Sequence, residues 1–186
     1  MKLETAEILS RFVDKENSSV PGFEQWVYSN PGLESDLGPG VYSELIALDF
    51  SDKSIRVNVK RIVDPILAYA DLHKSQLLSL IDGLVSKSIA PLKGIRDLNV
   101  WANKGYLFLG SIELVGNFGE QGKSIVHLID ESMNDNTQWN KTIEADPNFL
   151  DELASIKDKI ESGRIVLTGE KEELKYYGEQ FKYEEK

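Results

Sequence analysis

Apolar residues recur at helical spacing in the first part of the chain, with polar residues at the remaining positions. Residues 4–14 are the clearest case and predict an amphipathic helix. Its apolar stripe consists of Ile8, Leu9, Phe12 and Val13. Shorter helical segments are predicted downstream, separated by turn residues such as Pro21-Gly22 and Asn30-Pro31-Gly32. They cover residues 23–28, 33–37 and 41–50, and the spacing places Trp26 in the core.

Residues 54–63 fit two patterns. Ile55, Val57 and Val59 alternate as in a strand, whereas Ile55, Val59 and Ile62 fit a helical stripe. Because proline fits the first turn of a helix and aspartate can cap one, we favour a helix that restarts at Asp64-Pro65. A firmer helix is then predicted from a cap at Asp71 to about Val85.

The pattern changes to one typical of strands after Leu98. Three segments, Asn99–Trp101, Tyr106–Val115 and Ser124–Ile129, are rich in β-branched and aromatic residues and alternate with turn sequences. They predict an antiparallel β-meander. The glycine-rich stretch 116–124 resembles a phosphate-binding loop, but a strand-like sequence follows it, so we interpret it as a hairpin turn.

One further helix and two strands complete the pattern. Asp146-Pro147 opens a helix that Gly163 can end, and strands are predicted at 164–168 and 176–183. The fold class is therefore α+β, with a helical N-terminal half followed by the meander, the helix and C-terminal strands. We predict one domain over 1–186, helical to about residue 90 and sheet-rich over 91–186.

Charge is distributed unevenly along the 186 residues, whose formal net charge is −10. Residues 1–50 hold nine acids and three bases, and 130–161 again nine acids and three bases, whereas 51–110 hold five acids and nine bases. An acidic surface repels nucleic acid and attracts basic partners, or it serves solubility alone, as in many cytosolic proteins. The absence of cysteine fits a reducing compartment, and no segment resembles a signal peptide or a membrane span, so we expect a cytoplasmic protein.

Residues that could carry catalysis are few. His73 is expected in the polar first turn of a helix, in contact with solvent, and His127 at the edge of the core. Glu113 is expected on the wet face of a strand. Asp130, Glu131 and Asp135 lack the spacing of a calcium loop. We therefore expect no cofactor, no metal and no enzymatic activity.

One segment resembles a known module. Phe23-Glu24-Gln25-Trp26-Val27-Tyr28, followed by Leu33-Glu34, Leu37-Gly38 and Tyr42–Phe50, is similar to a short module of bacterial immunity proteins of toxin systems. The resemblance covers about a quarter of the chain. It implies a bacterial, cytoplasmic protein that binds a cognate toxin and occludes it. The acidic blocks would suit a basic nuclease toxin.

The expected contact surface is the second acidic block with a tryptophan in a polar segment, because carboxylates steer association and aromatic residues anchor it. Its residues are Asp130, Glu131, Asp135, Trp139, Glu144, Asp146, Asp151 and Glu152. Trp139 alternatively folds back onto the core. The C-terminal aromatic residues are expected in an edge strand on the sheet or in a contact surface, namely Tyr176, Tyr177, Phe181 and Tyr183.

Two other functions remain open. A carboxylate-based hydrolase or other enzyme would gather Glu113, His127 and Asp130 around one point. An oligomeric scaffold would associate with itself and have no toxin partner. The partner-binding hypothesis includes neither direct nucleic-acid binding nor membrane binding.

Overall fold

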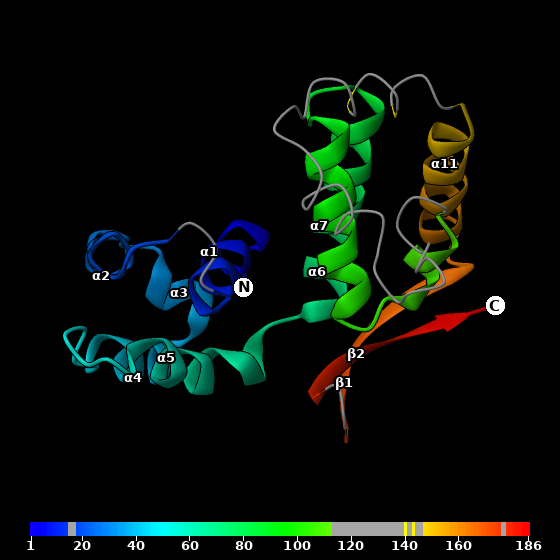
Figure 1. Cartoon of the computed structure of the whole chain (residues 1–186). Helices are drawn as coiled ribbons and strands as arrows, with labels where there is room; N and C mark the ends of the chain where they lie inside the picture. The colour runs from blue at the N-terminus through cyan, green and yellow to red at the C-terminus, as the bar shows by residue number, and fades with distance from the viewer. Residues whose placement is uncertain (15–17, 113–139, 141–142, 144–146, 176–177) are drawn as a thin grey trace. The chain divides into compact units, whose positions relative to one another are not determined.

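The structure is a computed structural model that describes residues 1–14, 18–112, 140, 143, 147–175 and 178–186. It confirms the α+β class, with N-terminal helices, a further helix and a C-terminal antiparallel pair of strands (Figure 1). The chain forms two compact units, Met1–Ala68 (unit 1) and Tyr69–Lys186 (unit 2). That the whole chain is one domain stays a prediction.

Unit 1 is helical throughout its described residues. Its elements are α1 (Leu3–Val13), α2 (Val20–Ser29), α3 (Leu33–Leu37), α4 (Pro39–Ile46), α5 (Ile55–Val63) and the 3-10 turn η1 (Asp64–Ile66). An apolar core joins them, and in it the rings of Phe12 and Phe23 stack with their centroids 3.8 Å apart. The predicted helices are confirmed, with two corrections. Pro21-Gly22, predicted as a break, lies in the first turn of α2, which Ser19 caps, and α4 ends at Ile46, before Phe50.

The ambiguous segment 54–63 is the helix α5, followed by the predicted restart at Asp64. Burial decides between the two patterns. Val59 and Ile62 lie in the core, whereas Val57, which a strand would have buried with Ile55, is 69% exposed. The Arg56 guanidinium also fixes α5 to the first helices, since it donates to the carbonyl oxygens of Phe12 and Ser18.

Unit 2 packs two long helices against a third helix and a β-hairpin (Figure 1). Its elements are α6 (Tyr69–Val85), α7 (Pro91–Asn103), the 3-10 turn η2 (Leu107–Ser111), α11 (Pro147–Glu161), β1 (Ile165–Leu174) and β2 (Gly178–Glu185). α6 contacts α7, α11 and β1, so it is the central element of this unit.

Two strands of the predicted meander are wrong in the described residues. Asn99–Trp101 is the last part of α7, and Tyr106–Ile112 forms the turn η2 and its flanks. The β-branched Val100 favoured a strand, but the buried Leu92, Ile95 and Leu98 define a helical stripe that leaves Val100 50% exposed. The rest of the meander, including 116–124 and Ser124–Ile129, lies outside the described residues.

The elements at the C-terminal end agree with the sequence, and only their extents differ. α11 begins at Pro147 and ends at Glu161, and Gly163 adopts a left-handed φ of 74° after it. β1 and β2 pair in antiparallel register, with an irregularity between Leu167 and Lys171. The described part of 91–186 contains the helices α7 and α11 beside the hairpin, and a sheet-rich character of the remainder of that half stays a prediction.

Candidate functional site

Most of the predicted contact residues lie outside the part of the chain that the structure describes. These are Asp130, Glu131, Asp135, Trp139, Glu144 and Asp146, together with the alternative catalytic residues Glu113 and His127. Asp151 and Glu152 are described, and both lie near the start of α11. Asp151 is exposed and Glu152 half-buried, so they stay candidates for a contact surface.

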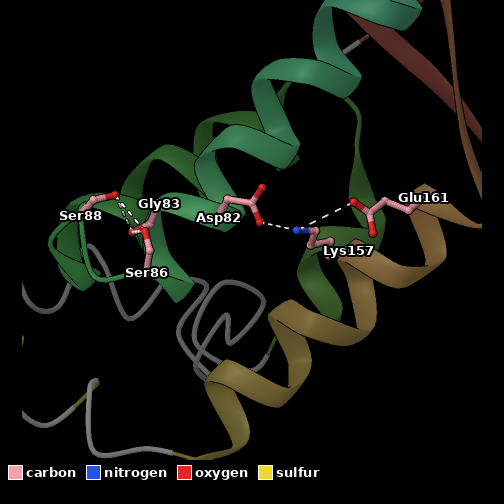
Figure 2. A network of polar contacts seen from close by, with 6 residues as sticks. All are labelled: Asp82, Gly83, Ser86, Ser88, Lys157 and Glu161. Atoms are coloured by element: carbon pink, nitrogen blue, oxygen red, sulfur yellow. Dashed lines mark hydrogen bonds and ion pairs between the residues drawn. The ribbon is translucent and has the colours of Figure 1, made fainter.

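Basic side chains lie among the acids of α11. Figure 2 shows Lys157 directed at Asp82 of α6 and at Glu161 one turn further along α11; the Lys157 Nζ–Glu161 carboxylate distance is 3.8 Å. The hydrogen bond to Asp82 is the main reason why the pKa of Lys157 is raised. Arg164 likewise pairs with Asp158. Much of the charge on this helix is therefore balanced locally.

The hairpin β1–β2 also contains ion pairs between lysines and glutamates. Lys171 lies 3.1 Å from the Glu179 carboxylate, and Lys182 lies 3.6 Å from Glu170 and 4.0 Å from Glu172. These pairs cross between the two strands, where opposite charges favour the register. Three of the six glutamates on the two strands are therefore paired with a lysine of the opposite strand.

The core of unit 2 contains a polar pair that the sequence did not predict. His73 Nδ1 lies 2.7 Å from the Tyr106 hydroxyl, and the rings of Trp101 and Phe181 contact the imidazole edge-on. His73 is only 2% exposed, so its predicted contact with solvent is wrong. The helix α6 begins at Tyr69, before the predicted cap at Asp71, and His73 lies on the same face as the buried Leu77 and Leu80, so the aromatic rings that cover this face exclude solvent from it.

Burial also fixes the protonation of this pair. Removal from water, with Lys104 and Lys171 nearby, lowers the pKa of His73 to about 3. Burial raises the pKa of Tyr106 above its ordinary value. At neutral pH the imidazole is therefore uncharged, and the hydroxyl keeps its proton. The pair joins α6 to the segment after α7 as a satisfied polar contact within an apolar core.

Unit 1 contains a stretch of sequence in which acids have no base among them. Between residues 16 and 52 the sequence contains seven acids and no lysine, arginine or histidine. Three of these acids, Glu24, Glu34 and Glu44, lie on α2, α3 and α4 and are accessible to solvent. Within the described residues, none of the three has a hydrogen bond or an ion pair.

The other acids of this stretch that the structure describes have local roles. Asp36 accepts a 2.7 Å hydrogen bond from the Thr5 hydroxyl and lies 3.6 Å from Lys2, and chiefly the Thr5 bond lowers its pKa. Asp49 accepts from the backbone and hydroxyl of Ser51, which lowers the pKa of that carboxyl. They shape turns and helix contacts and still leave the region negative.

Aromatic side chains accompany this charge. Tyr28 on α2 is 57% exposed, yet its hydroxyl donates to the carbonyl oxygen of Ile46 at 3.2 Å and its ring meets Phe50 edge-on. Trp26 is half-buried and touches Phe23, so its predicted place in the core is only partly right. Tyrosine and tryptophan in such positions are typical anchors of protein interfaces.

Sequence reasoning missed this surface, although a signal was present. The count over residues 1–50 showed an acidic excess, but only the run from 16 to 52 without a base shows that no cation is interleaved. At the C-terminus, Phe181 and Tyr183 pack against the core of unit 2, as the edge-strand interpretation predicted. Trp139, Tyr176 and Tyr177 lie outside the described residues.

The described residues offer neither a metal site nor a membrane-spanning helix. No three histidine or carboxylate side chains come close enough together there to hold a metal ion. No helix in the described ranges is both long and apolar enough for a membrane span. Comparison of the chain with protein-family models, characterised proteins and solved structures gives no match.

Proposed function

We propose that this protein is a bacterial immunity protein, which binds a cognate toxin domain in the cytoplasm and occludes it. One observation carries the proposal. The solvent-accessible carboxylates of α2, α3 and α4 have no cation among them in the sequence over 37 residues, 16 to 52, whereas acids of unit 2 such as Asp82 and Glu179 are paired with lysines. The resemblance of residues 23–50 to immunity proteins falls on this same segment.

Uncompensated surface charge has a clear physical use. Complementary potentials steer two proteins together and raise the association rate constant, with a strong dependence on salt. A nuclease toxin suits this surface because its cleft must be positive to hold a phosphate backbone. An inhibitor that occupies such a cleft needs carboxylates free of internal partners, as Glu24, Glu34 and Glu44 are within the described residues.

The direct test uses the C-terminal domain of the protein encoded immediately upstream of this gene. Co-expression with the full chain should restore growth of cells that produce that domain. Calorimetry should show a one-to-one complex whose affinity falls as salt rises from about 50 to about 250 mM. An unrelated acidic protein of similar net charge is the control and should not protect.

Two results would overturn the proposal. The first is the absence of both protection and binding. The second is turnover of a small substrate by the isolated chain, abolished by a single carboxylate or imidazole substitution, which would favour the enzyme hypothesis instead.

A further inference from the structure

We propose that the exposed side of α2 around Tyr28 is a docking surface for an arginine-bearing segment of a basic protein. That the partner is a protein rests on the proposed function; the chemistry of recognition rests on the surface itself. Helix α2 buries Phe23 and Val27 in the core of unit 1 and leaves Tyr28 largely in solvent.

The ring of Tyr28 is held in place before any partner arrives. Its hydroxyl is bonded to the Ile46 carbonyl oxygen, and its edge contacts the buried Phe50. A large side chain fixed in this way loses little conformational entropy on binding, which is what makes an interface anchor effective. Exposure of a ring that is already ordered therefore favours a contact role.

The charges near Tyr28 specify the class of partner. Glu24 lies one helical turn before Tyr28, on the same side of α2, and has no polar contact within the described residues. A guanidinium can stack on a tyrosine ring while its fork bonds a carboxylate one turn away. An ammonium makes the second contact as a point charge and stacks less well.

Exposed apolar side chains elsewhere in unit 1 lack this setting. Val57 of α5 is more exposed than Tyr28, at 69%, but α5 carries Arg56, Lys60 and Arg61. A basic segment would be repelled there. Val57 is therefore an internal control for the effect of exposure without complementary charge.

The first experiment maps an octa-arginine peptide on the full chain by amide chemical shifts at about 50 mM salt. We expect the largest shifts in α2 and in the end of α4. Octa-lysine, at equal charge, should bind several-fold more weakly because it stacks poorly. The absence of octa-arginine binding, or shifts centred on α11 or the hairpin, would overturn the proposal.

Matched variants separate the ring from the charge. Tyr28→Ala should weaken octa-arginine binding about tenfold, whereas Tyr28→Phe and Val57→Ala should change it less than about twofold. Replacing Glu24, Glu34 and Glu44 together by glutamine should weaken octa-arginine binding about tenfold or more. The same three-charge replacement at Glu173, Glu184 and Glu185 of the hairpin should weaken octa-arginine binding less than about twofold. Equal losses from both triple variants, or no loss from Tyr28→Ala, would mean nonspecific attraction and refute the docking surface.

The two proposals fail in different ways. If the upstream toxin domain does not bind but the peptide results hold, the surface stands and the immunity function is wrong. If the toxin domain binds and both Tyr28→Ala and the Glu24, Glu34 and Glu44 variant leave its affinity unchanged, the immunity function stands and this surface is not its contact.

Discussion

The two units of the chain differ in how their polar side chains are paired. Unit 2 buries the pair of His73 and Tyr106 and pairs several of its surface acids with bases, as in the contacts of Lys157 and Lys171. Unit 1 has a mostly apolar core, with stacked phenylalanine rings, and within its described residues Glu24, Glu34 and Glu44 of α2, α3 and α4 have no hydrogen bond or ion pair.

This difference indicates which polar side chains can contact a partner. A polar group that is satisfied internally stabilises the fold and has little left to offer a partner. A carboxylate without an internal partner adds little to stability, and repulsion between like charges makes it slightly costly. We propose that the carboxylates of α2, α3 and α4 serve binding, and the substitutions below compare the two units.

The largest expected loss of stability concerns Gly105, just after α7, where the hairpin backbone approaches closely. Gly105 has a φ of 118°, and a Cβ there would lie 2.3 Å from the carbonyl oxygen of Phe181. Gly105→Ala should therefore destabilise unit 2 by about 3 kcal/mol or more, because strain and a backbone clash add. Denaturant unfolding measures the loss, and hydrogen exchange should locate it in residues 69–186.

Gly163→Ala is the matched control for this substitution. Its φ is 74°, but a Cβ there would meet no atom within 4 Å. It should cost only about 1 kcal/mol, the penalty of the left-handed conformation alone. If both glycine substitutions cost the same, the contact between Gly105 and Phe181 does not set the stability of unit 2.

The second effect is a loss of stability in acid. Above pH 6.5 His73 is neutral in the folded and unfolded states; below it, only the unfolded state takes up the proton until pH about 3. Stability should therefore fall as pH falls through this window, by about 2 kcal/mol at pH 5. Unfolding titrations at pH 7 and pH 5, with the double variant His73→Phe/Tyr106→Phe as reference, measure this term.

The reference matters because the carboxylates of both units also titrate in acid. The double variant removes the imidazole together with its hydroxyl partner, so no polar atom of the pair is left unsatisfied. Its stability should fall less between pH 7 and pH 5 than that of the natural chain. Equal losses would show that His73 has no part in the acid sensitivity of unit 2.

The third effect compares one substitution in the two units. Tyr106→Phe removes the partner of His73 Nδ1 inside the core and should cost about 1–3 kcal/mol. Tyr28→Phe removes a hydrogen bond at the surface, where water can replace it, and should stay within about 0.5 kcal/mol. Chemical denaturation of both variants measures the difference, and a costlier Tyr28→Phe would contradict the contrast between the units.

The smallest effect is a stabilisation. Lys87, just after α6, is the one residue other than glycine with a positive φ, 60°, among those that the structure describes. Lys87→Gly relieves the steric cost of the left-handed conformation, although glycine adds entropy to the unfolded chain. A net gain of up to about 1 kcal/mol is expected in thermal unfolding. A loss of stability would show that the side chain of Lys87 makes a needed contact.

The sequence predicted helices far better than it predicted strands. Segments such as 4–14 and 147–161 have an apolar stripe that needs no distant partner to be recognised. The strand predicted at Asn99–Trp101 was wrong because β propensity depends on the surrounding structure. Val100 lies in the last part of α7, whose buried stripe makes this segment a helix. Of the predicted contact residues, only Asp151 and Glu152 lie in the described part of the chain, and they stay untested.

Local pattern by itself determined the α+β class, most helix positions and the acidity of the first fifty residues, since periodicity and charge are properties of the chain. Tertiary structure decided what each polar group does. It buried His73 against Tyr106 and left Glu24 beside an ordered Tyr28 without a polar partner among the described residues. Such roles depend on which segments meet in space, and that is decided only when the core forms.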